Sequence, residues 1–396
     1  MSFPSRYLLP QAQMIITDTL LSPIRLTVLG DSKRDLSRFW EVMVTLSGTE
    51  STGVLPLQQE VVAVLGNSNP FWTHAQRCLW IAERDGRVVG RIAGIIDTTH
   101  QKIHQDQTAF FGYLVCIDDP LVAETLFQAV ILWSRELGCN RLRGPINPSI
   151  NEECGLLISG FERPNAVMMP YSAPYLPRRI EECGFSGVKD LKVIEITLSD
   201  GPMERLTRLK KGVIARLKDV RLVSVTRSTL ALHLPKLKEV YNSAWEKNWG
   251  AVPMTSAEIN FLATRLRPLL VDGLVWLAEV GGKPAGFLLA VPDVNEALGP
   301  LRGRLLSFSL IRALPILMGW RRPKKFRIVA LGVTAAYRRQ GIEGVLFAET
   351  LSAGLHLGFK ECEASWVLED NYGVHQLAEV FCGRTVQQYR IYERSI

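Results

Sequence analysis

A short basic segment that contains two glycines has the composition of an anion-binding loop. Residues 338–344 read RRQGIEG, between an apolar run at 326–334 and a run at 341–357 that predicts a helix. The first turn of a helix offers unpaired backbone N–H groups and a partial positive charge, and glycines let a ligand approach the backbone. With Arg338 and Arg339 beside it, this loop predicts a binding site for a pyrophosphate.

The loop belongs to a longer pattern that occurs twice in the chain. Residues 79–97 (LWIAERDGRVVGRIAGIID) and 275–293 (VWLAEVGGKPAGFLLAVPD) share a Trp, an Ala, a Glu and two Gly at equivalent places. Each reads as two apolar, β-branched runs around a two-residue turn, which is typical of a β-hairpin. Because further elements recur in the same order, we predict a duplicated protein.

In both copies the predicted order is hairpin, strand, long amphipathic helix, strand, helix, strand, with helices before the hairpin. The first copy has them at 33–46, 79–97, 108–117, 120–137, 140–146, 174–183 and 188–198. The second has them at 233–248, 255–270, 274–292, 326–334, 341–357, 361–368, 373–382 and 386–393, after a basic helical link at about 201–222. This order predicts an α/β protein with a mixed sheet, divided into domains at 1–200 and 201–396.

The anion-binding loop is expected only in the second copy. At the equivalent place the first copy has Asp118, Asp119 and Pro120, so two carboxylates replace two arginines and the glycine is missing. Two carboxylates would repel a pyrophosphate. We therefore expect the first copy to have lost the pyrophosphate site and to serve as scaffold or as a wall of the site in the second copy.

Residues 333–346 resemble the acetyl-CoA-binding signature of the GNAT superfamily of N-acyltransferases, V-x-P-x-x-R-x-x-G-x-G/A-x-x-L. Val333, Arg338, Gly341 and Leu346 match it, whereas Glu343 stands where glycine or alanine is usual. The resemblance implies two tandem GNAT folds, a thioester of CoA or of acyl carrier protein as co-substrate, and no metal. It also implies that the donor is held by Leu331, Gly332, Val333, Arg338, Arg339, Gln340, Gly341, Ile342, Glu343, Gly344 and Asn371.

The same resemblance implies proton-transfer groups after the strand at 361–368. Glu369 is the candidate base, because an amine must lose a proton before it attacks the thioester. GNAT enzymes often use a tyrosine of the next helix as general acid, but Glu379 occupies that place here. Tyr389 and Tyr392 are the candidate replacements, with His375 as a further option.

Long stretches also resemble a narrower bacterial group of tandem GNAT proteins that includes the ceramide synthases. Among them are RLRGPINPSINEECGLLISGF (141–161) and YNSAWEKNWGAVPMT (241–255). The resemblance implies that a long-chain acyl group is transferred to a sphingoid-type or other lipid amine. Asn147, Asn151 and Glu152 follow a strand of the first copy, where a loop could reach the second copy's cleft and bind the acceptor.

The second copy carries an insertion at about 299–325 that is basic and amphipathic. It combines Leu, Ile, Phe, Met and Trp side chains with several Arg and Lys, and contains no acidic residue. This composition is typical of a helix in a membrane interface and equally of a lid packed on the other copy.

The composition fits a soluble, well-packed α/β protein, and the resemblance implies a role in lipid metabolism. The chain has 396 residues, of which 47% are hydrophobic and 21% charged, and a net charge of +7. Seven cysteines without a CxxC pair indicate buried thiols in a reducing compartment. No signal peptide and no apolar run of about 18 residues are apparent, so we expect a cytoplasmic protein, with peripheral contact at the inner membrane face as an option.

Two other functions remain open at this point. An amide-forming transferase that uses aminoacyl-tRNA would explain the basic link, but residues 205–221 lack interleaved aromatic residues, so nucleic acid is the less favoured partner. A non-catalytic acyl-CoA-binding protein would explain Glu343 and the missing tyrosine.

Overall fold

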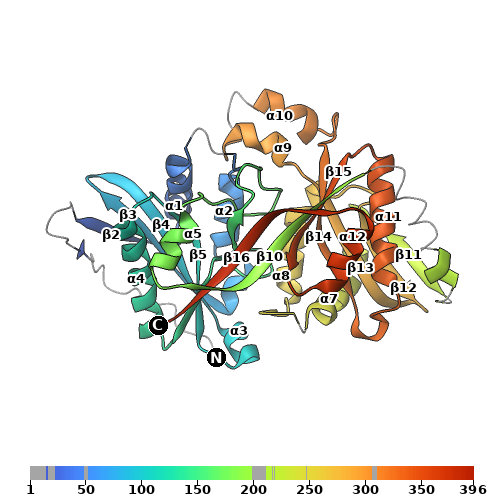
Figure 1. Ribbon diagram of the computed structural model, residues 1–396, viewed down its shortest axis with the longest axis horizontal. Helices are drawn as coiled ribbons and strands as arrows, with labels where there is room; N and C mark the ends of the chain where they lie inside the picture. Colours follow the sequence, from blue (N-terminus) through green and yellow to red (C-terminus); the bar gives the residue numbers. More distant parts are fainter. Residues whose placement is uncertain are drawn as a thin grey trace.

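A large mixed sheet of 14 strands runs through the described residues, with helices packed on both of its faces, and β7 and β8 form a separate two-stranded sheet (Figure 1). The computed structural model describes residues 15–16, 23–48, 52–198, 211–215, 217, 219–246, 248–305 and 310–396. The strand order is β1-β2-β3-β4-β5-β6-β16-β10-β15-β14-β13-β12-β11, and β9 pairs with β16 beside this path. The predicted α/β class with a mixed sheet is confirmed.

The first half has the predicted order of elements. They are β1 (Ile15–Ile16), β2 (Ile24–Leu29), α1 (Lys33–Leu46), α2 (Gln58–Leu65), η1 (Pro70–Thr73), β3 (Ala75–Arg84), β4 (Arg87–Asp97), α3 (Thr98–His104), β5 (Thr108–Cys116), α4 (Pro120–Glu136), β6 (Arg141–Gly144), β7 (Ile146–Asn147), β8 (Glu153–Cys154), β9 (Leu156–Ser159), α5 (Leu176–Glu182) and β10 (Ser186–Thr197).

The second half repeats that order. Its elements are β11 (Val220–Ser224), α7 (Leu230–Trp245), α8 (Ser256–Leu266), η2 (Arg267–Leu269), β12 (Val275–Val280), β13 (Lys283–Pro292), α9 (Asn295–Leu298), η3 (Gly299–Leu301), α10 (Leu310–Leu317), β14 (Lys325–Val333), η4 (Ala335–Tyr337), α11 (Ile342–His356), β15 (Glu361–Leu368), α12 (Tyr372–Val380) and β16 (Arg384–Ser395). The predicted basic helix at about 201–222 lies mostly outside the described residues. The predicted end of this helix near residue 222 is wrong, because strand β11 begins at Val220.

Both predicted hairpins form, and their turn residues show why. Asp85 and Gly86 join β3 to β4 with φ of 52° and 71°, and Gly281 and Gly282 join β12 to β13 with φ of 56° and 77°. Two successive positive φ angles match the right-handed twist of the strands, and glycine or aspartate adopts them at low cost.

The two halves exchange their last strands. β10 comes from the first half but pairs with β15, whereas β16 comes from the second half and pairs with β6. β10 and β16 also pair with each other, from Ser186 with Glu393 to Glu195 with Arg384, and cross the middle of the molecule in Figure 1. The exchange extends to the cores: Tyr392 packs around α4, and Ile196 packs around α11. The predicted boundary at residue 200 falls outside the described residues.

A histidine between two carboxylates also joins the halves. His74 Nδ1 lies 3.0 Å from Asp97 Oδ1, at the end of β4, and its Nε2 lies 3.3 Å from Glu258 Oε1, in α8. Hydrogen bonds to Asp97 and Glu258 raise the pKa of His74 from 6.5 to about 9, although burial opposes the change. The imidazolium is therefore a charged bridge between the halves at neutral pH.

This bridge predicts a loss of stability on the alkaline side. Because the folded-state pKa is above the unfolded value, the contribution is fully present below pH 6.5 and disappears as the pH rises to about 9. Solvent access reduces the effect to roughly 1–2 kcal/mol. Urea unfolding across this range should show the decline in the native protein and a flatter profile in His74→Gln. An equal decline in both would contradict the assignment.

Candidate functional site

The centre of the second half is a place where two parallel strands separate. β14 pairs with β15 only from Lys325 with Glu361 to Ile328 with Ala364. Beyond that point β14 continues to pair with β13 as far as Val333, after a register shift between Ala330 and Ile328. A gap therefore opens between β14 and β15 in which the backbone of β14 lacks a strand partner on one side.

The hydrogen-bonding pattern shows which backbone groups face this gap. Thr334 N donates to Ala285 O at 2.9 Å, so this pair belongs to the hydrogen-bonded set of the antiparallel ladder with β13. Since hydrogen-bonded pairs alternate along such a ladder, Gly332 is also bonded to β13. Leu331 and Val333 then direct their N–H and C=O groups away from β13 and into the gap.

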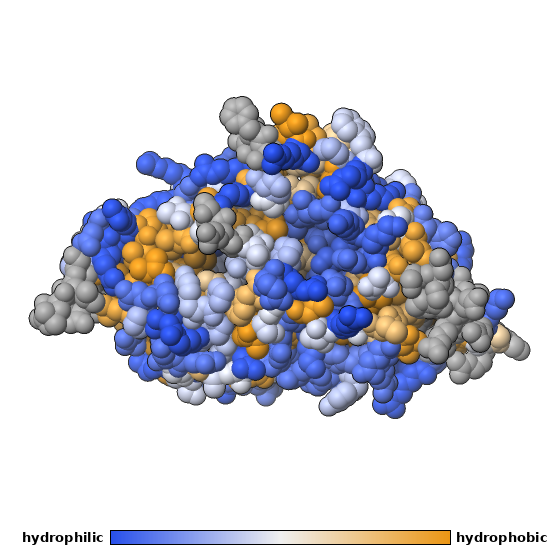
Figure 2. Space-filling model, turned by 45° about the horizontal axis from the view of Figure 1, so that its top comes forward, coloured by the Kyte–Doolittle hydropathy of each residue, from blue (hydrophilic) through white to orange (hydrophobic). Residues whose placement is uncertain are grey.

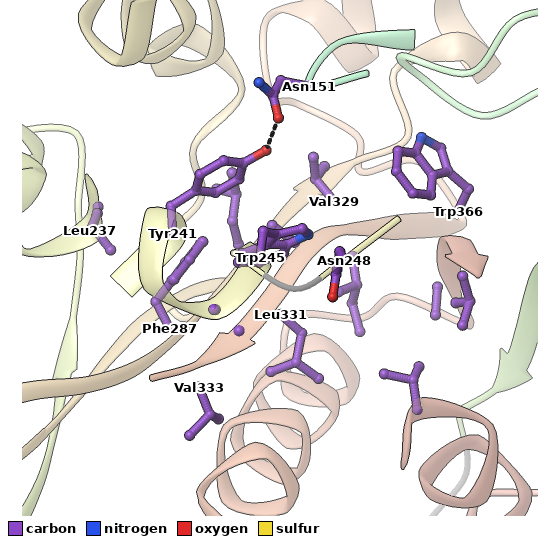
Figure 3. Close-up of a pocket in the computed structure, with 18 of the residues that line it drawn as sticks. Asn151, Leu237, Tyr241, Trp245, Asn248, Phe287, Val329, Leu331, Val333 and Trp366 are labelled. Carbon is purple, nitrogen blue, oxygen red and sulfur yellow. Dashed lines mark hydrogen bonds between the residues drawn. The ribbon is translucent and has the colours of Figure 1, made fainter. Parts of the chain in front are cut away.

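A cavity of about 470 Å³ occupies the gap and extends between the helices α7 and α8 (Figure 3). Most of its wall is apolar. Aliphatic and aromatic side chains come from α7 (Leu230, Leu234, Leu237, Tyr241 and Trp245) and from α8 (Ile259, Leu262, Ala263 and Leu266). Polar groups that border it come from the loop before α11, from residues 151 and 152, and from Asn248, Arg327, Ser365 and Asn371. A wall of this kind suits a ligand with one polar and one hydrocarbon part.

The loop before α11 has the geometry that its sequence predicts. Arg339 has a φ of 63° and Gly341 a φ of 87°, and α11 begins at Ile342 without a side-chain cap. Its first N–H groups are therefore not bonded by a capping side chain and can bind an anion. The Arg338 guanidinium donates to the carbonyls of Ser243 (3.2 Å) and Ala244 (3.0 Å), which attaches the loop to the end of α7.

Glu343 is an unusual residue for this place. It lines the cavity in the first turn of α11, and its Oε2 is buried with no hydrogen-bond partner among the described residues. A negative charge near a helix N-terminus is favourable for the helix. The same charge opposes a bound phosphate, so the site combines attracting backbone groups with one repelling side chain.

The structure brings most of the predicted donor residues together. Leu331, Gly332, Val333, Arg338, Arg339, Glu343 and Asn371 line the cavity. Gln340, Gly341, Ile342 and Gly344 lie in the same loop and first helical turn without forming its wall. Asn371 caps α12, where its Oδ1 accepts from Val374 N at 3.4 Å.

The equivalent gap of the first half is filled by the chain itself. β5 pairs with β6 only from Thr108 to Phe110, but β7 then lies beside β5, and Tyr113 N donates to Asn147 Oδ1 at 2.7 Å. The fit is so close that a Cβ on Gly112 would meet Ile146 O at 2.1 Å. Asp119 caps α4 by accepting from Leu121 N at 2.9 Å. In this half the equivalent gap is therefore filled, and the equivalent helix, α4, has a capped N-terminus.

The predicted proton-transfer residues lie away from the cavity wall. Glu369 accepts from Asp190 N (3.2 Å), lies 3.7 Å from Lys189 Nζ and has a half-exposed side chain. Tyr389 and Tyr392 are fully buried, and their hydroxyls donate to Pro170 O (3.1 Å) and Glu181 Oε1 (3.3 Å). Burial raises the pKa of both tyrosines.

His375 is also outside the wall of the cavity, as is the thiol of Cys382 in the turn after α12. His375 Nε2 lies 3.1 Å from Leu368 O, and Cys382 is exposed. The structure therefore places none of the predicted acid–base residues against the gap between β14 and β15.

Two of the three predicted acceptor residues do reach the cavity. Asn151 and Glu152 line it, whereas Asn147 stays in the filled gap of the first half. Sequence reasoning missed their partners. Tyr241 donates from its hydroxyl to Asn151 Oδ1 at 2.8 Å (Figure 3), and Arg265 Nη1 lies 2.6 Å from Glu152 Oε1. Residues 241–255 were among the stretches that resemble the ceramide synthase group, but nothing in their sequence indicated that Tyr241 contacts Asn151.

Comparisons with known proteins agree with this geometry. The chain is 34% identical over 373 residues to the bacterial ceramide synthase of Caulobacter vibrioides, covering 91% of this chain and 95% of that one. It is 32% identical over 379 residues to protein YghO of Escherichia coli, covering 92% and 94%. The chain belongs to the same family as the bacterial ceramide synthase. No protein-family model matches it.

Solved structures show the GNAT fold over the whole length of the chain. A tandem GNAT protein from the clavulanic acid biosynthesis pathway superposes with a TM-score of 0.58 at 13% identity, covering 94% of this chain and 98% of that one. A GCN5-related N-acetyltransferase from Sphaerobacter thermophilus gives a TM-score of 0.50 at 13% identity, with coverages of 93% and 95%. The resemblance to the GNAT fold that was stated from the sequence is confirmed.

Two further features bear on this GNAT protein. Within the described ranges no helix is both long and apolar enough to cross a membrane. The same residues contain no group of three or more His, Cys, Asp or Glu that could hold a metal ion.

Gly344 offers a test of the donor loop that leaves the fold intact. A Cβ at this position meets nothing within 4 Å, and an acidic residue in the first turn suits the helix. We predict that Gly344→Asp weakens CoA binding about tenfold, because a carboxylate near the pyrophosphate costs about 1–2 kcal/mol. Gly48→Asp, equally open but in the first half, is the control in calorimetric titration with CoA. Unchanged affinity in Gly344→Asp would contradict this site.

Proposed function

We propose that this GNAT protein transfers a long-chain acyl group from acyl-CoA to the primary amine of a sphingoid-type lipid. The name of its relative from Caulobacter vibrioides supports this substrate class. The observation that carries the proposal is the cavity, which extends from the anion-binding loop through the gap between β14 and β15 to an apolar region between α7 and α8. An enzyme that transfers only acetyl groups to polar amines has no need for that region.

In this proposal the backbone of the second half binds and polarises the donor. The first turn of α11 and Arg339 hold the diphosphate, while Leu331 and Val333 bond to the pantetheine arm and orient the thioester carbonyl. Backbone N–H groups directed at that oxygen stabilise the charge that develops on it. The apolar wall binds the hydrocarbon chain of one or both substrates, and burial of each methylene contributes about 0.8 kcal/mol.

The apolar wall can be tested by filling it. We predict that Ala263→Trp on α8 reduces turnover of palmitoyl-CoA with sphinganine at least tenfold, because the indole occupies space needed by a hydrocarbon chain. Ala257→Trp, at an exposed position of the same helix outside the cavity, is the control. Activity is measured by mass spectrometry of the amide product.

Pairing acetyl-CoA with sphinganine, and palmitoyl-CoA with a short amine, tells which chain the wall binds. If Ala263→Trp keeps full activity with the two long chains, or the native enzyme accepts acetyl-CoA and short amines alone, the proposed substrate class is wrong.

We also propose that α10 and the turn after it contact an anionic membrane, from which a lipid amine has to be taken up. Ala313 and Ile316 pack against α9 and η3, and this leaves Ile311 (72% exposed), Met318 (59%) and Trp320 (75%) on the outer side. The exposed cations Arg312, Arg321, Arg322 and Lys324 surround them. Figure 2 shows hydrophobic and hydrophilic residues side by side at the top of the molecule. The combination matches a surface that inserts side chains between anionic lipids.

Flotation with vesicles measures this contact. We predict that the protein binds vesicles containing phosphatidylglycerol more tightly than vesicles of phosphatidylcholine alone, and that Trp320→Ser weakens the binding about tenfold, since a large apolar side chain is lost from the interface. Tyr372→Ser, 73% exposed on α12, is the matched control. Equal loss in both variants, or no preference for anionic vesicles, would refute the membrane surface.

A further inference from the structure

A hairpin of the first half enters the cavity of the second. β7 and β8 pair through Ile146 with Cys154 and Asn147 with Glu153, so residues 148–152 form the tip. Its base is fixed where the first half's gap is filled: Tyr113 N donates to Asn147 Oδ1 at 2.7 Å, and Gly155 N donates to Pro145 O at 2.9 Å. The segment that fills the gap of the first half thus also holds residues 148–152 at the gap of the second half.

The tip is fastened on the side of the second half as well. Asn151 Nδ2 donates to Val252 O at 3.0 Å, and Asn151 Oδ1 accepts from the Tyr241 hydroxyl at 2.8 Å. Tyr241 in turn stacks on Trp245, with ring centroids 4.5 Å apart. In Figure 3 the Asn151–Tyr241 pair stands above the strand that carries Leu331. The two polar side chains therefore lie on the cavity wall in a fixed arrangement.

Glu152 gives this wall a negative charge. Its side chain is 11% exposed and lies 2.6 Å from Arg265 Nη1, but Arg265 is shared with Glu60 of α2. Two carboxylates thus share one guanidinium through different nitrogens, and Glu153 follows Glu152 in the chain. Among the described residues that line the cavity, the carboxylates are Glu152 and Glu343, and Glu343 belongs to the donor loop.

We infer that residues 151 and 152 of the first half, with Tyr241 of the second, form the binding subsite for the acceptor's amine. The Glu152 carboxylate pairs with the ammonium group and accepts one proton from it, and the Asn151–Tyr241 pair binds a hydroxyl or carbonyl next to the amine. This inference rests on the proposed function, and it gives the role of base to Glu152, whereas Glu369 lies outside the cavity wall.

The reaction at this subsite balances as follows. The ammonium gives one proton to Glu152, and the neutral nitrogen attacks the thioester carbonyl carbon. A C–N bond forms and the C–S bond breaks, so that CoA leaves as a thiolate. The second proton of the attacking nitrogen goes to the sulfur, giving the amide and CoA thiol, and Glu152 releases its proton to solvent.

The surroundings of Glu152 determine when it can act. Burial raises the pKa of Glu152, while the charge of Arg265 and its hydrogen bond lower it. The charged or titratable groups that face it from the adjoining elements are Glu60, Tyr113, Glu153, Tyr241, Glu258 and Arg265. The carboxylates of this set oppose further negative charge, which favours a bound ammonium.

Glu152→Gln and Glu60→Gln form a matched pair for the test, because both residues contact Arg265 and only Glu152 lines the cavity. With palmitoyl-CoA and sphinganine, or any amine that the native enzyme acylates, Glu152→Gln should lower kcat/KM for the amine by about 100-fold and Glu60→Gln by less than about threefold. The loss in Glu152→Gln should shrink as the pH approaches the pKa of the free amine. Affinity for CoA should stay unchanged in both variants.

Calorimetric titration of sphinganine into the CoA-bound protein makes the test independent of turnover. Weaker amine binding in Glu152→Gln alone supports the subsite even if no acyl transfer is found, an outcome that would sink the proposed function. Equal effects of both variants, a pH-independent loss, or an unaffected Glu152→Gln would overturn the subsite and leave the proposed function standing.

Discussion

The separation of β14 from β15 is the constraint on which the rest of the site depends. Backbone N–H and C=O groups must find partners, and those of Leu331 and Val333 lose theirs once the ladder with β15 ends at Ile328. Closing the gap would satisfy them, but beyond this point β14 stays paired with β13 and β15 stays paired with β10. The fold therefore maintains a row of unpaired backbone groups beside a helix N-terminus, and an extended, anionic ligand is what such a row is able to bind.

The first half shows what happens when the same gap has no ligand to bind. There the chain supplies its own occupant: β7 lies along β5, and the Asn147 amide accepts the N–H of Tyr113. Gly112 allows the close approach, and Asp119 caps the helix that would otherwise meet a phosphate. The first half therefore differs from the second in two ways, and the absence of the arginines and the glycine is the first of them. The second change is that β7, a segment of the chain itself, occupies the place of an extended ligand. Its residues lie outside the part of the chain that corresponds to the acetyl-CoA-binding signature.

Local features of the sequence predicted the local structure well. Turn residues with positive φ placed both hairpins, and the apolar periodicity placed helices such as α1, which has the predicted bounds 33–46. The exchange of β10 and β16 could not be predicted, because duplicated strands carry similar patterns and either sheet edge accepts them. For the site, too, local features could be predicted and long-range contacts could not. Donor residues on one continuous strand, loop and helix came together, whereas Glu369, Tyr389 and Tyr392 depended on how distant elements meet. Tyr392 belongs to the core of the first half only because β16 crosses over.

The exchange also explains how a loop of one half can serve the other. Catalytic and binding groups need to be held to within a fraction of an ångström, and two domains joined by a linker usually move relative to one another. Here β6, β16, β10 and β15 form one continuous ladder, so a shift between the halves would break main-chain hydrogen bonds throughout its middle. The His74 bridge and the Glu60–Arg265–Glu152 cluster cross the same junction. Duplication alone would give two similar domains. Strand exchange makes their relative position part of the fold, and the hairpin tip at 148–152 is then held as firmly as a residue within one domain.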